Sequence, residues 1–467
     1  MMYTRGHKQL FDDWAAAGNA GWSYKEVLPY FIRAENNKNP ELVEKEYHGY
    51  QGPLTVQRFS HKPAFVDTIL AAAAELGYHQ TDLNGHNQTG FAVAQMMVDG
   101  GLRASTARMY VRANKKRKNL VVKINSQVTR IVIDPMAKRA KAVEFIDSTG
   151  RRQTVIAKRE IILSAGAVGS PHLLLLSGVG PKAVLKKFQI PVVQNLPVGQ
   201  NLHNHVATGL RFSIDDDDRR TLTMNALQRF LDNREGPLAS TGITQVTGFI
   251  QSKYAAGDMP DIQVFFDGFS AGCSETGKDE ECSNGKVATT CGKRHINIRP
   301  TNILARSKGH LTLKSKDPLE APAIYPNYLT EEIDVKVLIE GLKFILRLVE
   351  TSALKKWGIE MDRTPAAGCG HLDFASDRYW ECIIREHTGP ENHPAGSCRM
   401  GPVGDSQAVV DPELRVHGVT NLRVVDASVF PLVPNANPVA GIIMTAEKGA
   451  DMIRAAWSAP GAGKKGA

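Results

Sequence analysis

The sequence contains no long apolar run and no pair of closely spaced cysteines. The longest apolar candidate, Leu173 to Leu176, is far shorter than the roughly 18 residues that a membrane helix needs, and Pro171 and Gly178 flank it. The six cysteines include no Cys-x-x-Cys pair, which is the spacing that structural zinc sites normally use. We therefore expect neither a transmembrane segment nor a bound metal.

Charge is not concentrated at one place either. The formal net charge is +9, but the basic residues are spread along the chain, and only Lys115 to Lys118 form a tight cluster. Nucleic-acid-binding proteins gather basic residues on one face or along one helix. The sequence therefore predicts no nucleic-acid partner. It also shows no signal peptide, which by itself leaves the location of the protein open.

A chain of 467 residues favours two domains, because a single hydrophobic core stops growing at about 250–300 residues. The capping box Ser23–Glu26 and apolar residues at helical spacing predict three helices, which we place at 23–31, 65–76 and 331–350, and a further helical stretch at 103–117. Apolar runs and alternating patterns predict strands at 120–124, 128–133, 142–146 and 160–163, with more between 245 and 266.

One glycine pattern imitates a dinucleotide-binding turn and is rejected. Gly178-x-Gly180-x-x-Ala183 follows an apolar run, but the residues after Pro171 have the character of a helix, whereas the dinucleotide fingerprint follows a strand. The acid that should follow about twenty residues later is also missing, since Gln200 and Asn201 stand there. We expect no nucleotide at this turn.

The same residues belong to a more specific set of motifs. Gly166 to Gly180 reads Gly-Ala-Val-Gly-Ser-Pro-His-Leu-Leu-Leu-Leu-Ser-Gly-Val-Gly, and a second stretch, Leu196 to His205, reads Leu-Pro-Val-Gly-Gln-Asn-Leu-His-Asn-His. Asn392 to Gly401 reads Asn-His-Pro-Ala-Gly-Ser-Cys-Arg-Met-Gly, and Asp426-Ala427-Ser428 and Asn437-Pro438 follow it. Together these segments resemble the signatures of the glucose–methanol–choline oxidoreductases. Within that family, the resemblance to the insect glucose dehydrogenase branch rests on Gly236-Pro237-Leu238, Thr247-Gly248-Phe249, Pro326-Asn327-Tyr328-Leu329 and Trp380-Glu381-Cys382.

The resemblance implies an α/β fold in which a Rossmann-like FAD-binding domain is joined to a substrate domain with an antiparallel sheet and flanking helices. It implies FAD-binding segments at 1–50, 103–205 and 402–457, and substrate-binding segments at 51–102 and 206–401. The residues 458–467 are Gly, Ala, Lys, Ser and Pro, and are expected to form a disordered tail. The polar segment 268–293 reads as a surface insertion.

The resemblance also assigns the site. It implies His393 and Asn437 as the catalytic pair, and FAD contacts from a set of residues that we expect to be Val128, Gly166, Asp426, Ala427, Asn437 and Pro438. Departures from the family pattern are Ser397 where Thr is usual and Asn204 where Asp is usual. His205 is expected to be structural, because a histidine in such a turn more often bonds backbone groups.

The chemistry of alcohol oxidation requires such a pair. A neutral imidazole can take the hydroxyl proton, and an amide can bond the same oxygen without competing for that proton. The resemblance therefore implies hydride transfer from a sugar or other alcohol to FAD, with a quinone or oxygen as the electron acceptor. Two alternatives stay open: a hydroxynitrile-lyase-like member without net redox change, and a non-catalytic remnant that binds no flavin.

The remnant alternative arises from the start of the chain. Thr4-Arg5-Gly6 resembles the family just after its first flavin signature, so we expect the strand–turn–helix that holds the FAD pyrophosphate to be missing and FAD binding to be weak. The resemblance suggests an extracellular protein. If the protein is secreted, Cys369 and Cys382 are expected to form a disulfide, whereas the pairing of Cys273, Cys282 and Cys291 stays open.

Overall fold

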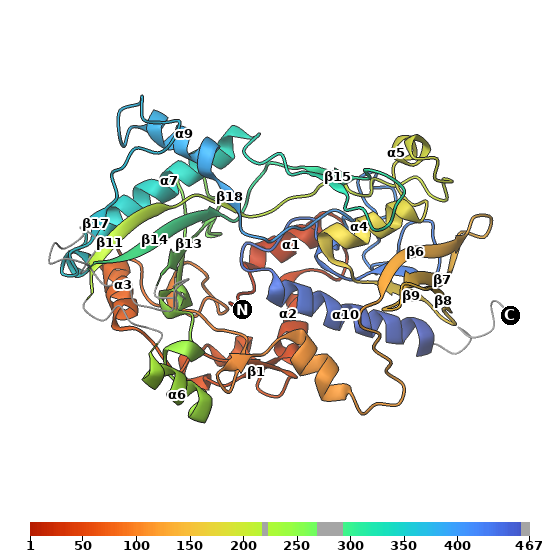
Figure 1. Ribbon diagram of the computed structural model, residues 1–467, viewed down its shortest axis with the longest axis horizontal. Helices are drawn as coiled ribbons and strands as arrows, with labels where there is room; N and C mark the ends of the chain where they lie inside the picture. The colour runs from red at the N-terminus through yellow and green to blue at the C-terminus, as the bar shows by residue number, and fades with distance from the viewer. Residues whose placement is uncertain (217–222, 269–292, 459–467) are drawn as a thin grey trace.

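The computed structural model describes residues 1–216, 223–268 and 293–458, and Figure 1 shows them as two adjoining parts. The buried side chains form two large clusters. One is built mainly from the first 56 residues, residues 131–198 and residues 395–444, and the other mainly from residues 65–93 and 206–384. Two clusters of this size agree with the expectation of more than one core, while the segment boundaries given above stay a prediction.

An antiparallel sheet organises the second cluster. Its strands run in the order β17 (Glu360–Met361), β11 (Leu210–Asp215), β14 (Lys293–Asn302), β13 (Ile262–Asp267), β12 (Val246–Ile250) and β3 (Gly90–Val93), and β10 (Val206–Ala207) pairs with both β14 and β18 (Gly389–Pro390). Helices α3 (Ala64–Glu75) and α7 (Glu332–Val349) pack on one face. Because side chains alternate along a strand, Val264 and Phe266 face these helices, and Gln263 and Phe265 face the other part of the molecule.

A short parallel pair lies in the first cluster. Strand β9 (Ile161–Leu163) pairs in register with β19 (Leu422–Val424), although the paired residues lie 261 positions apart in the sequence. Helices α4 (Gly166–Leu176) and α10 (Val439–Ser458) flank this pair, and a three-stranded antiparallel sheet of β6 (Gln127–Asp134), β7 (Arg139–Ile146) and β8 (Arg152–Ile156) packs beside α4 (Figure 1).

The remaining elements connect these layers. The helices are α1 (Lys8–Ala16), α2 (Tyr24–Ala34), α5 (Lys182–Lys187), α6 (Met224–Asn233), α8 (Ser352–Lys355) and α9 (Asp377–His387). The short strands are β1 (Glu35–Asn37), β2 (Leu54–Val56), β4 (Val98–Asp99), β5 (Leu102–Arg103), β15 (His310–Thr312) and β16 (Ala323–Tyr325). In the part of the chain that the structure describes, no helix has the length and apolar character of a membrane span.

Several predicted elements are confirmed. The carboxylate of Glu26 accepts a hydrogen bond from the backbone N–H of Ser23 at 3.1 Å, as expected of a capping box at the start of α2. The helices predicted at 65–76 and 331–350 are α3 and α7. The segment after Pro171 is helical, as the sequence predicted, since α4 runs through it to Leu176.

One local prediction was wrong. Leu120 to Ile124 forms no strand, and Val121 and Ile124 are 81% and 76% exposed. A strand needs a neighbour for its backbone groups, and no described strand lies beside this segment. The helical stretch predicted at 103–117 is confirmed only over 107–114, where a π-helix at Ala107–Val111 is followed by a 3-10 helix at Arg112–Asn114.

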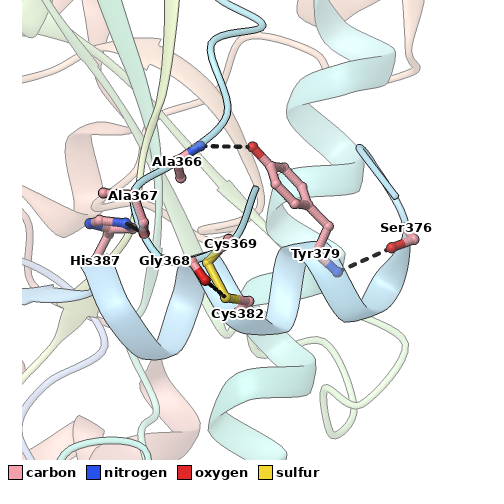
Figure 2. The surroundings of a disulfide bond; sticks show 8 residues. All are labelled: Ala366, Ala367, Gly368, Cys369, Ser376, Tyr379, Cys382 and His387. Carbon is pink, nitrogen blue, oxygen red and sulfur yellow. Dashed lines mark hydrogen bonds between the residues drawn. A yellow bond between two sulfur atoms is a disulfide. The ribbon is translucent and has the colours of Figure 1, made fainter. Parts of the chain in front are cut away.

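The predicted disulfide is present. Cys369 and Cys382 are bonded, with their Cα atoms 5.9 Å apart, and Figure 2 shows that the bond ties a loop to helix α9. The same loop is held by Tyr379, whose hydroxyl accepts from the N–H of Ala366 at 3.2 Å. The other expectations for cysteines fall on residues 273, 282 and 291, which lie outside the described residues, as does most of the tail.

A buried cluster of charged side chains joins the N-terminal segment to the loops around it. His48 lies between two carboxylates, with Nδ1 2.9 Å from Glu35 and Nε2 2.9 Å from Asp82. Burial opposes protonation of His48, but these two hydrogen bonds raise its pKa. Glu35 also accepts from the guanidinium of Arg5, and both side chains are almost fully buried. The cluster holds two cations against two carboxylates, so its charges balance without solvent.

Removing one of these carboxylates should therefore be costly. In Glu35→Gln, Arg5 and His48 share a single buried anion, Asp82, and we expect a loss of about 3–5 kcal/mol of stability. Urea unfolding followed by tryptophan fluorescence measures it. The matched control is Glu332→Gln, which breaks an exposed pair with Lys336 and should leave the stability nearly unchanged. Equal effects of the two substitutions would contradict this account of the cluster.

Candidate active site

The loop that carries His393 is bonded to a carbonyl group of helix α4 that has no donor within the helix. Pro171 lies inside α4 and has no N–H, so the carbonyl of Ala167 loses its helical donor. The hydroxyl of Ser397 donates to that carbonyl at 2.6 Å and is fully buried. Ser397 stands where the family usually has Thr, and this hydrogen bond needs only the hydroxyl that the two residues share.

Asp426 ties the same helix to strand β19. Its Oδ2 accepts from the N–H of Gly166 at 2.9 Å and from the hydroxyl of Ser170 at 2.5 Å, while Oδ1 accepts from the N–H of Ser428 at 2.8 Å. Gly166 has φ +81°, which only glycine adopts without strain, and a Cβ there would meet nothing within 4 Å. The turn from β9 into α4 is thus fixed by a carboxylate while its outer side stays open.

His393 is held from two sides. Its backbone N–H donates to Oδ1 of Asn204 at 2.8 Å, and the Nδ2 of Asn204 donates to the hydroxyl of Tyr328 at 3.0 Å. Its Nδ1 lies 3.0 Å from the Nδ1 of His205, with the two rings nearly perpendicular at 88°. Burial lowers the pKa of His393 to about 4, so its imidazole is neutral at physiological pH.

His205 was expected to bond backbone groups, and the structure places it against His393 instead. Its neighbour His203 shows the behaviour that the sequence suggested for His205. Nδ1 of His203 donates to the carbonyl of Asn201 at 2.6 Å, and Nε2 accepts from the N–H of Val433 at 2.8 Å. Both ring nitrogens of His203 are used by the backbone, so its role is structural.

Asn437 precedes helix α10 and belongs to a network of polar side chains. Its Oδ1 accepts from Gln263 on β13 and from the hydroxyl of Thr4, both at 3.2 Å, and its backbone N–H donates to the same hydroxyl at 3.0 Å. With both acceptor positions of Oδ1 occupied, the Nδ2 amide remains as a donor without a partner in the described part of the chain. The side chain is half-buried, so a ligand can reach it.

The loop of His393 is connected by the backbone to the segment that follows strand β19. The N–H of Gly396 donates to the carbonyl of Ala427 at 3.1 Å, and the N–H of Cys398 donates to the carbonyl of Ser428 at 2.7 Å. These bonds bring the predicted residues Asp426, Ala427 and Gly166 together with the loop of His393. Sequence reasoning missed Asn204, Thr4 and Gln263, because nothing in their local motifs marks their side chains as neighbours of Asn437 or His393.

Two predicted cofactor residues have less specific surroundings. Pro438 is the residue before α10, where a missing N–H costs nothing, and its carbonyl accepts from Ile442 at 2.9 Å. Val128 lies at the start of β6 opposite Phe145 and packs against the first hydrophobic cluster. The assignment of both to the cofactor stays a prediction.

The residues at this junction fit the ring end of a flavin. Gly166 leaves open space beside a turn, Asn437 offers a free amide, and the ends of two parallel strands meet there, which is where α/β folds bind ligands. Within the described residues, no group of three or more His, Cys, Asp and Glu side chains is arranged to hold a metal ion.

Comparison with known proteins settles the family. Models of the GMC oxidoreductases match residues 1–207 and 305–446. The chain belongs to the GMC oxidoreductase family. It is 46% identical over 461 residues to "Glucose dehydrogenase [FAD, quinone]" of Drosophila melanogaster, covering 98% of this chain and 73% of that protein. It is 34% identical to human mitochondrial choline dehydrogenase, covering 97% of this chain and 73% of the relative.

Solved structures confirm the fold class. Formate oxidase superposes with a TM-score of 0.83 at 23% identity, over 98% of this chain and 82% of that one. Pyridoxine 4-oxidase superposes with a TM-score of 0.79 at 24% identity, over 97% and 82%. The fold is therefore that of the family, an FAD-binding domain with a substrate domain built on an antiparallel sheet, as the sequence predicted.

Proposed function

We propose that this chain is an FAD-dependent oxidoreductase that removes a hydride from a CH–OH group of a sugar or other alcohol, with His393 as the base. The observation that carries the proposal is that His393 can accept a proton while Asn437 can donate a hydrogen bond. The imidazole of His393 is neutral, with its Nδ1 held and its Nε2 unpartnered in the described residues, while Asn437 presents a free amide donor.

These states match the proton movement of alcohol oxidation. Nε2 of a neutral His393 accepts the hydroxyl proton, and the imidazolium that forms then stabilises the negative charge growing on the substrate oxygen. Nδ2 of Asn437 donates to the same oxygen, and because Gln263 and Thr4 hold its Oδ1, the amide is already oriented before the substrate binds.

The cofactor supplies the hydride acceptor, the flavin ring. Gly166, Asp426, Ala427 and the Asn437-Pro438 turn are the residues that we propose to hold the ring end. The names of the relatives support FAD, and the insect enzymes are named for a quinone acceptor whereas the bacterial choline dehydrogenases are named oxygen-dependent. Because identity to the insect enzymes is higher, at 46% against 35%, we propose a quinone as the acceptor.

His393→Ala tests the role of the base. We expect the rate of flavin reduction to fall by about 10²–10⁴-fold, with the flavin content of the protein unchanged. Stopped-flow absorbance of the flavin bands measures both, and a quinone dye follows turnover. A flavin-loaded variant with a nearly normal rate would refute the assignment, and a wild-type chain without flavin bands would favour the remnant alternative.

The wild-type protein should also show a pH dependence. Because the pKa of His393 is about 4, the rate of flavin reduction should stay constant above about pH 5 and fall as the pH drops through about 4, where His393 becomes protonated.

Asn437 should show a dependence on charge. In Asn437→Asp a carboxylate stands where the amide donates, so it repels the negative charge that grows on the substrate oxygen, and we expect a slowing of about 10²-fold or more. Asn437→His keeps a donor and should be milder. Single-turnover reduction at saturating substrate separates the two, and equal small effects would place Asn437 outside the reaction.

We further propose that the protein is exported through the secretory pathway. The Cys369–Cys382 disulfide supports this, because such bonds persist in oxidising compartments. Asn87-Gln88-Thr89 is an acceptor motif for N-glycosylation, and Asn87 is exposed.

Expression in insect cells behind a secretion signal tests whether the chain forms the disulfide and is glycosylated in the secretory pathway. We expect a glycosidase-sensitive mass that Asn87→Gln abolishes, with the secreted yield maintained. Secreted protein with a free Cys382 thiol and no glycan would contradict the proposal.

A further inference from the structure

The contact between His393 and His205 has a consequence for the proposed base. Two nitrogens of the same kind lie 3.0 Å apart, Nδ1 facing Nδ1, and the rings meet edge to face with their centroids 5.1 Å apart. A hydrogen bond at this distance needs a proton on one of them and a lone pair on the other. The position of the proton decides whether His393 can act as a base at Nε2. A neutral His393 with its proton on Nδ1 has a free lone pair on Nε2, whereas the tautomer with its proton on Nε2 has none there.

The surroundings of His205 favour the arrangement in which it accepts. His205 is fully buried, and its Nδ1 lies against His393. Its other nitrogen, Nε2, is therefore the one that can carry a proton toward the backbone of Ile303. That interaction favours protonation of the ring. Nε2 makes no complete hydrogen bond within the described residues. The preference is therefore weaker than at His203, where both nitrogens have partners at 2.6 and 2.8 Å.

Burial keeps His205 from gaining a second proton. It lowers the pKa of His205 far below its ordinary value, and the nearby titratable side chains His393, His203 and Lys308 lower it further.

We propose that His205 is a positioning residue that accepts a hydrogen bond from Nδ1 of His393. It fixes the ring of the base and its tautomer, so that Nε2 of His393 carries the lone pair that faces the substrate. Burial of His205 opposes a further proton transfer from His393 to His205, so the positive charge stays beside the substrate oxygen. The inference rests on the proposed role of His393.

The tautomer can be measured without any reaction. In the purified chain labelled with ¹⁵N-histidine, the ring signals of His393 are assigned by their loss in His393→Gln. We expect a directly bonded proton at Nδ1 and none at Nε2. A proton at Nε2 and a bare Nδ1 would overturn the proposal. It is also independent of whether His393 acts as the base, which His393→Ala decides.

Substitution of His205 separates acceptance from mere packing. His205→Asn places an amide oxygen close to the position of Nδ1 and should preserve the His393 tautomer, with flavin reduction within about tenfold of wild type. His205→Phe keeps a ring but no acceptor, so we expect the Nδ1 proton to be lost and kcat to fall about 10²-fold with a smaller change in KM. Equal tautomers and equal rates in the two variants would refute the role of His205.

Discussion

The absent N–H of Pro171 is the constraint on which the candidate site depends. A proline inside α4 leaves the carbonyl of Ala167 without its helical donor, and the buried hydroxyl of Ser397 satisfies it from a loop 230 residues away in the sequence. Asp426 completes the same junction by binding Gly166 and Ser170 at the start of that helix. An unpaired buried carbonyl or carboxylate would be costly, so the loop of His393, the turn into α4 and the end of β19 hold one another in place.

Much of this junction could be predicted because its residues lie in continuous motifs. The segments around Gly166, His393, Asp426 and Asn437 were identified from sequence, and the structure brings Gly166, Asp426 and the His393 loop together. The motifs do not contain the hydrogen-bond partners of Asn437, which come from distant parts of the chain. Gln263 lies on β13 and Thr4 near the start of the chain, and both bond Asn437 only because the polar face of the antiparallel sheet lies against this turn.

The failed prediction has a similar cause. Leu120 to Ile124 has the composition of a strand, but β-propensity describes how well side chains fit a paired and half-buried surface, and no described strand pairs with this segment. The helical stretch predicted at 103–117 is confirmed only over 107–114, as a π-helix followed by a 3-10 helix. Each of these outcomes depends on tertiary neighbours, which a local pattern does not specify.

His203 and His205 show how the same residue type in one turn acquires two roles. His203 faces backbone groups that use both of its nitrogens, and burial lowers its pKa to about 3, so it is a neutral and saturated bridge between two loops. His205 faces another imidazole. Either of two neutral imidazoles can donate in the hydrogen bond between them, so something else has to decide which one does. The chemistry of the base supplies that distinction, because His393 has a lone pair on Nε2 only when its proton is on Nδ1, where His205 accepts it. The charge that an alcohol oxidation creates is thereby directed to the histidine that faces the substrate.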